Sequence, residues 1–132
     1  MSTAMAHAMQ MQEKLREESR SYETLAEEMN ANVVARQQAQ QQLSENEMVL
    51  KELEILEDDA KVYKLTGPVL IKQDLSEARG NVEKRLDYIR AENERLEKAS
   101  AELEKKQRDK QQGIIELQQK MMQLANPSGE GA

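Results

Sequence analysis

Residues 61–73 read Lys-Val-Tyr-Lys-Leu-Thr-Gly-Pro-Val-Leu-Ile-Lys-Gln, and this stretch decides the fold. Two short segments, 61–65 and 69–73, are rich in β-branched, aromatic and other apolar residues, which favour strands. Between them lies Thr66-Gly67-Pro68, and Gly and Pro are the residues that most strongly mark turns. The stretch therefore predicts a β-hairpin at mid-chain that reverses the direction of the chain.

The chain before this hairpin carries a heptad pattern. Steps of alternating three and four residues meet an apolar residue or Tyr at ten of fourteen positions. The fourteen positions are Ala8, Met11, Leu15, Glu18, Tyr22, Leu25, Met29, Asn32, Arg36, Ala39, Leu43, Asn46, Leu50 and Leu53. Because neither Gly nor Pro occurs within residues 1–66, the pattern predicts one coiled-coil helix over about residues 8–57.

The chain after the hairpin carries a second heptad pattern of nearly equal length. Its positions are Leu75, Arg79, Val82, Leu86, Ile89, Asn93, Leu96, Ser100, Leu103, Gln107, Lys110, Ile114, Leu117, Met121 and Leu124. Asp74 with Glu77 three residues later forms a capping-box pattern at the start, and Asn126-Pro127-Ser128-Gly129 cannot continue a helix. The pattern predicts a helix over residues 74–124 and a disordered tail over residues 125–132.

Together these segments predict a mainly α fold, a long antiparallel two-helix coiled coil with one β-hairpin at the bend, as a single domain over residues 1–132. The reversal brings Leu50 near Val82, Met29 near Leu103 and Leu15 near Leu117. Polar residues interrupt both heptad patterns, and such residues fix register and partner number at some cost in stability. They are Glu18, Asn32, Arg36, Asn46, Asn93, Ser100, Gln107 and Lys110.

Composition excludes several classes of function. The chain has no Phe, Trp or Cys, so it lacks the bulky residues of a thick core and any thiolate metal site. Its net charge is −6 with acidic and basic residues interleaved, which argues against nucleic acid as a partner. The N-terminus lacks the apolar stretch of a signal peptide or membrane span, and a membrane-surface helix would need a basic polar face. We expect a cytoplasmic protein without a membrane or nucleic-acid partner.

No catalytic constellation stands out in the sequence. His7 has no nearby Cys or fixed base as a partner, and no Gly-rich phosphate-binding loop is present. The run Glu57-Asp58-Asp59 lacks the spaced oxygen ligands of a calcium loop. We therefore expect no enzyme activity and no cofactor.

The predicted hairpin is expected to mediate assembly. Val69-Leu70-Ile71 is apolar on both faces of its strand, and an isolated two-stranded hairpin is marginally stable in water. Exposed apolar strands commonly pair with another chain, so the stretch predicts an oligomer. The expected oligomerisation residues are Val62, Tyr63, Leu65, Gly67, Pro68, Val69, Leu70 and Ile71. In the alternative interpretation, the hairpin folds down on the helix ends as a connector.

Methionine is concentrated at the two chain ends, which an antiparallel hairpin brings together at one tip. Six of the eight methionines lie there, and Met is a flexible residue that serves promiscuous binding surfaces. Ile115 and Met122 fall off the heptad positions and should face water. The expected tip residues, which could bind unfolded chains, are Met5, Met9, Met11, Leu15, Ile114, Ile115, Leu117, Met121, Met122 and Leu124. Alternatively, the composition of fraying ends carries little meaning.

The hairpin and the residues after it resemble the β-type subunits of the prefoldin family. The resemblance lies in Val62–Gln73, in Glu77-Ala78-Arg79 and in Lys84-Arg85-Leu86-Asp87-Tyr88-Ile89. It implies a heterohexamer of two α-type and four β-type subunits, whose hairpins form a double β-barrel platform with six coiled-coil tentacles. It also implies that unfolded actin and tubulin are held at the tips and passed to the group II cytosolic chaperonin without ATP hydrolysis. The other hypothesis is a structural coiled-coil adaptor that binds no unfolded protein.

Overall fold

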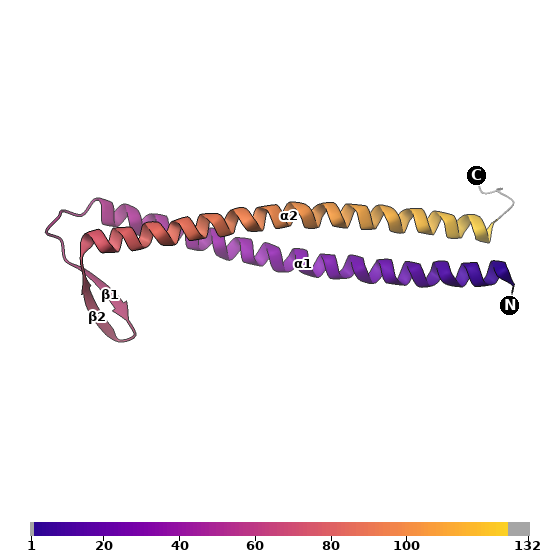
Figure 1. The fold of residues 1–132 in the computed structure, drawn as a ribbon, viewed down its shortest axis with the longest axis horizontal. Coiled ribbons are helices and arrows are strands. Elements are labelled where there is room, and N and C mark those ends of the chain that lie inside the picture. The colour runs from indigo at the N-terminus through magenta and orange to yellow at the C-terminus, as the bar shows by residue number, and fades with distance from the viewer. Residues whose placement is uncertain (1, 127–132) are drawn as a thin grey trace. The chain divides into compact units, whose positions relative to one another are not determined.

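The computed structural model describes residues 2–126, which form two long helices with a β-hairpin between them (Figure 1). The elements in chain order are α1 (Thr3–Glu54), β1 (Val62–Thr66), β2 (Val69–Gln73) and α2 (Leu75–Ala125). This order confirms the fold class expected from the sequence. Of the expected tail, Ala125 ends α2 and Asn126 is a bend, while residues 127–132 lie outside the described part of the chain.

The start of α1 lies five residues ahead of the expected position at residue 8 because Ser2 caps it. The backbone N–H of Met5 donates to Ser2 Oγ at 3.1 Å, and the N–H of Ala6 donates to the Ser2 carbonyl at 3.0 Å. A serine hydroxyl that accepts from the third residue after it is a preferred N-cap, since it satisfies a donor that has no partner within the helix. At α2, the Asp74 carbonyl accepts from the N–H of Ala78 at 2.9 Å.

The end of α1 lies at Glu54 instead of the expected residue 57, and the side chain of Arg79 from α2 caps it. The Arg79 guanidinium donates to the carbonyl oxygens of Leu53 at 3.0 Å, Glu54 at 3.4 Å and Leu56 at 3.1 Å. The last carbonyls of a helix lack partners within the helix, and a cation at this end also interacts favourably with the helix dipole. Arg79 therefore ties the end of α1 to the first turns of α2.

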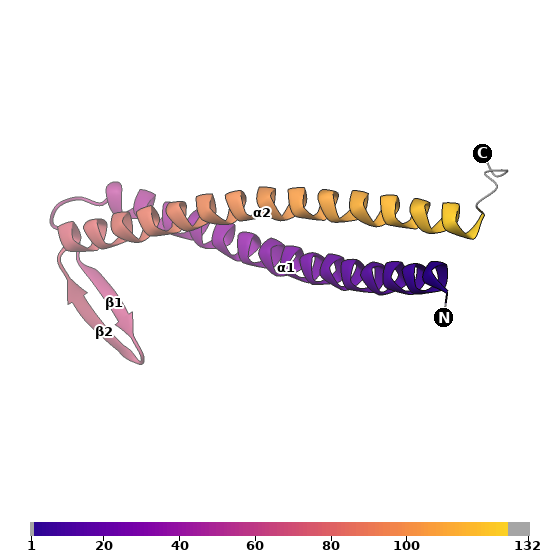
Figure 2. The same ribbon diagram turned by 45° about the vertical axis from the view of Figure 1, so that its right-hand side comes forward.

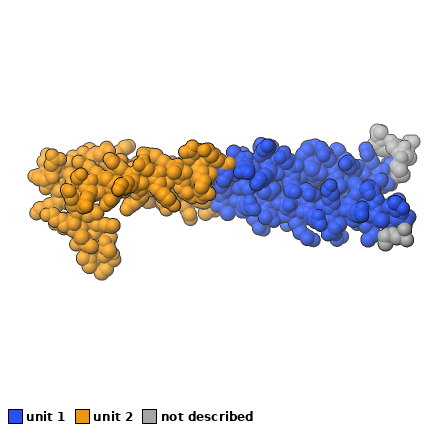
Figure 3. Space-filling view, viewed as in Figure 1, with its two compact units in different colours: residues 1–33, 99–132 blue, residues 34–98 orange. Residues whose placement is uncertain are grey.

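The chain forms two compact units, residues 34–98 and residues 1–33 with 99–132, which Figure 3 colours separately. In the unit of residues 34–98, the core is made largely by α2, and its most buried side chain is Leu86 at 1% exposure. The Asn93 side chain donates across the helix pair to the Ala39 carbonyl at 3.4 Å. This hydrogen bond and that of Arg79 to Leu53 both join residues that the expected register places opposite each other.

In the unit of residues 1–33 and 99–132, the two helix segments are also antiparallel neighbours. Ser100 Oγ donates to the Met29 sulfur at 3.9 Å, and Lys110 Nζ lies 3.0 Å from a carboxylate oxygen of Glu18. Relative to the expected register, which paired Met29 with Leu103 and Leu15 with Leu117, both contacts are shifted by about one helical turn. Met11 and Leu117 are the large buried apolar side chains of this unit.

The β-hairpin has a two-residue loop of Gly67 and Pro68. Thr66 pairs with Val69, Leu65 with Leu70, and the ladder continues to Val62 with Gln73. Gly67 has φ of +58°, which glycine adopts without steric cost, and the ring of Pro68 fixes a negative φ. A positive φ at the first loop position followed by a negative one fits a type II′ turn, whose twist matches that of the flanking strands.

Replacing Gly113 by Ala should stabilise the chain. Gly113 lies inside α2, and a Cβ built on it meets nothing within 4 Å, so the substitution gains helix propensity without a clash. The expected gain is about 1 kcal/mol, or roughly 3–5 °C in Tm for a chain of this size. Thermal unfolding followed by circular dichroism measures it. Gly80→Ala is a matched variant with the same open surroundings, and a lower Tm for Gly113→Ala alone would mean that α2 must bend at residue 113.

Replacing Arg79 by Ala should destabilise the end of α1, because three carbonyl oxygens lose their donor together. The expected cost is roughly 1–3 kcal/mol in the free energy of unfolding, with faster amide hydrogen exchange in residues 51–57. Arg95→Ala is the control, since Arg95 pairs with the neighbouring Glu92 on an exposed face, and it should change stability little. Equal effects of the two variants would argue against the capping role of Arg79.

Candidate functional site

The hairpin register distributes apolar side chains over both of its faces. Paired residues share a face and successive residues alternate, so Tyr63, Leu65 and Leu70 lie on one face with Lys72. Val62, Val69 and Ile71 lie on the other, with Lys64, Thr66 and Gln73. The hairpin is thus apolar on both faces, as the sequence of Val69-Leu70-Ile71 predicted.

The structure leaves these side chains exposed. Tyr63, Leu65, Val69, Leu70 and Ile71 are 50–67% exposed, and Val62 is half-buried. Figures 1 and 2 show the reason, because β1 and β2 project away from the helix ends of their own unit. The alternative in which the hairpin folds down onto the helices is therefore not the arrangement of this chain.

Each strand of the hairpin is paired on one side within the described residues, since the sheet has two strands. In a hairpin with a two-residue loop, the residues that flank the loop form a hydrogen-bonded pair, and such pairs alternate along the ladder. The backbone groups of Tyr63 and Leu65 in β1, and of Leu70 and Lys72 in β2, therefore point outward. The hairpin presents two strand edges as well as two apolar faces.

Ile55 and Leu56 add exposed apolar surface that the sequence analysis missed. Both lie on the connection from α1 to β1, and Ile55 is the most exposed large apolar residue described. The sequence analysis placed them inside the helix because the heptad spacing continues to residue 57. The signal that could have revealed them is the local sequence Ile-Leu-Glu-Asp-Asp, in which two apolar residues precede an acidic turn.

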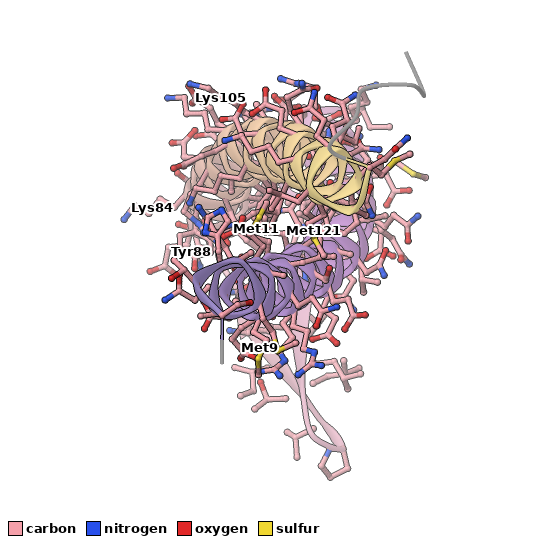
Figure 4. The ribbon with its side chains drawn as sticks, turned by 90° about the vertical axis from the view of Figure 1, so that its right-hand side faces the viewer. Met9, Met11, Lys84, Tyr88, Lys105 and Met121 are labelled. Carbon is pink, nitrogen blue, oxygen red and sulfur yellow. The ribbon has the colours of Figure 1, made fainter. Side chains whose placement is uncertain are left out.

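The two ends of the described chain lie side by side in the unit of residues 1–33 and 99–132. A groove of about 270 Å³ between them is lined by Ala4, Ala8, Met11, Gln12, Met121, Leu124 and Ala125. Figure 4 shows Met11 and Met121 between the two helices and Met9 on the outer side of α1. The ends of α1 and α2 thus form a common apolar tip.

The ten expected tip residues divide into two sets. Met11 and Leu117 are buried, while Leu15, Ile114 and Met121 are half-buried, so these five contribute to packing between the helices. The other five are exposed, and we call them the tip surface: Met5, Met9, Ile115, Met122 and Leu124. Ile115 and Met122 are exposed as their off-heptad positions predicted. Leu124 is exposed although its heptad position suggested burial, because α2 ends one residue later.

A polar section of the helix pair lies next to the tip. The Glu18 and Lys110 side chains, each about 30% exposed, form an ion pair between α1 and α2. A groove of about 570 Å³ is lined there by Glu18, Ser21, Thr24, Leu25, Glu28, Lys106, Asp109 and Lys110. The ion pair replaces the apolar contact that a heptad position normally makes, and polar residues at such positions can fix the register of two helices.

The described residues offer little that suits acid–base chemistry or metal binding. A hydrogen bond from Arg95 lowers the pKa of the Glu92 carboxyl, but both side chains lie on an open helix face. Within residues 2–126, His, Asp and Glu side chains form no group of three or more that could hold a metal ion. Over the same residues, neither helix has a segment long and apolar enough to cross a membrane.

Two long antiparallel helix segments with an exposed apolar β-hairpin between them define a class of protein, the coiled-coil subunits with one hairpin. A solved structure of this class, the prefoldin beta subunit from Thermococcus strain KS-1, matches the chain with a TM-score of 0.71 at 24% identity. The match covers 76% of this chain and 89% of that one. It supports the same fold for both chains.

The chain belongs to the prefoldin family, because the family model described as prefoldin subunit matches residues 16–121. It is 40% identical to human prefoldin subunit 6 over 92% of this chain and 94% of the relative. It is 55% identical to prefoldin subunit 6 of Arabidopsis thaliana over 63% of this chain, a match that spans 64% of that relative. The resemblance to the prefoldin family seen in residues 62–89 is confirmed, and both of these relatives are named prefoldin subunit 6. Membership identifies the chain as a co-chaperone subunit with other prefoldin subunits as its partners.

Proposed function

We propose that this chain is a β-type subunit of a heterohexameric cytoplasmic prefoldin, which joins the other subunits through its hairpin and holds unfolded proteins at its tip. The clients are unfolded actin and tubulin, which the complex passes to the group II cytosolic chaperonin without ATP hydrolysis. The observation that carries the proposal is the hairpin Val62–Gln73, which is apolar and exposed on both faces.

The assembly role follows from what the hairpin leaves uncovered. Burying one large apolar side chain contributes about 1.5–3 kcal/mol, and five such side chains of this hairpin are at least half exposed. Its outward backbone groups can extend the sheet with strands from other chains. A barrel built from several hairpins removes both edges and buries the face that lines its interior. Two such barrels packed against each other, as in the double-barrel platform, also cover part of the outer face.

The β-type assignment follows from the number of hairpins. In the described chain, α1 and α2 are joined by one hairpin of two strands, and β-type subunits supply one hairpin each to the platform. The relatives named subunit 6 and the beta subunit of known structure agree with this assignment.

The client role follows from the tip surface. Met5, Met9 and Met122 are 54–71% exposed, and unfolded chains expose apolar segments that such a surface can bind. Flexible thioether side chains adapt to different segments, which suits a holder of several clients. The sequence has no Gly-rich phosphate-binding loop, in agreement with holding that needs no nucleotide.

Replacing Leu70 and Ile71 by Lys tests the assembly role. The two side chains lie on opposite faces of the hairpin, so the variant introduces charge into both expected contacts, and a buried unpaired charge is strongly unfavourable. We expect the variant to remain monomeric in size-exclusion chromatography with the other subunits, at unchanged helix content. The matched control is Met5→Lys with Met122→Lys, which adds the same charge at the tip surface and should enter the hexamer. Entry of the hairpin variant into a complex of normal size would contradict the assembly role.

A photoreactive residue at position 115 or 122 tests client binding directly. Both positions are exposed and off the heptad pattern, so a crosslink formed there reports contact with a client and not packing between the two helices. We expect crosslinks to chemically denatured actin in the assembled complex, without nucleotide, and few to folded actin. The same residue at position 48, on an exposed site of the other unit, is the control. Crosslinks to client at residues 61–73 and none at 115 or 122 would contradict the tip model, and absence of client at every position would favour the adaptor hypothesis.

A further inference from the structure

The exposed apolar residues of the tip surface differ chemically from those of the hairpin. Three of the five are methionines, Met5, Met9 and Met122, with Ile115 and Leu124 beside them. A thioether sulfur has a lone pair that reacts with peroxide, whereas the aliphatic carbons of Ile and Leu are inert to it. Most of the exposed apolar tip can therefore be changed by one simple chemical reaction.

We propose that Met5, Met9 and Met122 form a peroxide-sensitive modification site whose oxidation releases clients from this subunit, an inference that rests on the proposed client role of the tip. In the reaction, the sulfur lone pair attacks one oxygen of hydrogen peroxide. The O–O bond breaks, an S–O bond forms and water leaves after proton transfer. The sulfur loses two electrons and the peroxide gains them, so each methionine consumes one peroxide and yields one sulfoxide.

Oxidation changes the binding surface and leaves the fold intact. A sulfoxide oxygen is a strong hydrogen-bond acceptor and binds water in the client-free state. Contact with an apolar client segment removes this water and offers no donor in its place, so client binding becomes less favourable. The three sulfurs belong to exposed side chains, so the sulfoxides remain hydrated in the client-free state and helix packing is retained. We expect capture by this subunit to weaken roughly tenfold, which corresponds to the loss of a single favourable contact.

The structure sets the order of oxidation. Met11 is 7% exposed and lies with Met121 between the helices (Figure 4). The half-buried Met29 sulfur accepts a hydrogen bond from Ser100. These sulfurs should react later than the exposed ones. Met48 is 63% exposed and lies in the unit of residues 34–98. It should therefore react as fast as the tip methionines, and its oxidation should not change client binding at the tip.

The experiment compares three complete complexes that differ in this subunit alone. One contains the unchanged chain, one contains Met5→Leu, Met9→Leu and Met122→Leu, and one contains Met48→Leu. Leucine retains apolar area and removes the reactive sulfur. Each complex is treated with hydrogen peroxide until mass spectrometry finds sulfoxide at the exposed methionines and thioether at Met11, and the peroxide is then destroyed. Capture is measured as crosslinking from a photoreactive residue at position 115 to denatured actin, which isolates this subunit from the tips of the others.

Each complex is compared with its own crosslinking level before peroxide treatment. The expected result is a tenfold loss for the unchanged and Met48→Leu complexes, and no loss for the triple-Leu complex. Methionine sulfoxide reductases for both sulfur epimers, with a dithiol as the reductant, should restore the loss. Size-exclusion chromatography and circular dichroism should be unchanged throughout. Equal loss in the triple-Leu complex, or full capture by a chain with verified sulfoxides, overturns the proposal. A complex that never crosslinks to client before peroxide treatment instead overturns the client role and with it this inference.

Discussion

The described chain covers neither face of its two-stranded hairpin. Two helices of more than fifty residues end and start beside the hairpin, yet its apolar side chains remain exposed. These are Tyr63, Leu65 and Leu70 on one face, and Val69 and Ile71 on the other. The helices bury their own apolar residues against each other and project no surface over the strands. The isolated chain therefore leaves its hairpin uncovered, and membership in a family whose members are subunits of a larger complex agrees with this constraint.

The base of the hairpin is held by contacts that stabilise the helices rather than the strands. Arg79 binds three carbonyl oxygens at the end of α1, and its own helix begins directly after β2. Leu75, Ala78 and Val82 are buried in the same turns of α2. Because both connections to the hairpin start from this packed region, the strands keep their order and register without a core of their own.

Local sequence signals predicted most of the fold and the register of the helix pair in residues 34–98, whereas the capping contacts of Arg79 were not predictable from them. Gly67-Pro68 between apolar segments indicates a turn, and heptads indicate helices, since both signals act over a few residues. The sequence showed Arg79 as a heptad position and as part of the stretch that resembles prefoldin, but not as a capping residue. Its partners at Leu53, Glu54 and Leu56 lie more than twenty residues away. The exposure of Ile55 and of Leu124 likewise needed the structure, whereas the burial of Met11 agrees with its heptad position.

The two exposed apolar surfaces of the chain differ in stiffness, and this difference fits two kinds of partner. The hairpin uses Val, Ile, Leu and Tyr, whose few side-chain conformations suit a fixed interface that forms once with a defined geometry. The tip surface uses mainly Met, whose three rotatable bonds allow it to adapt to different apolar segments. A stiff surface discriminates among partners and a flexible one tolerates many, so the proposed assembly role and the proposed client role fall on surfaces that differ in their choice of apolar residue. The tip surface also contains sulfur, which oxidants can modify, whereas residues 61–73 contain neither Met nor Cys.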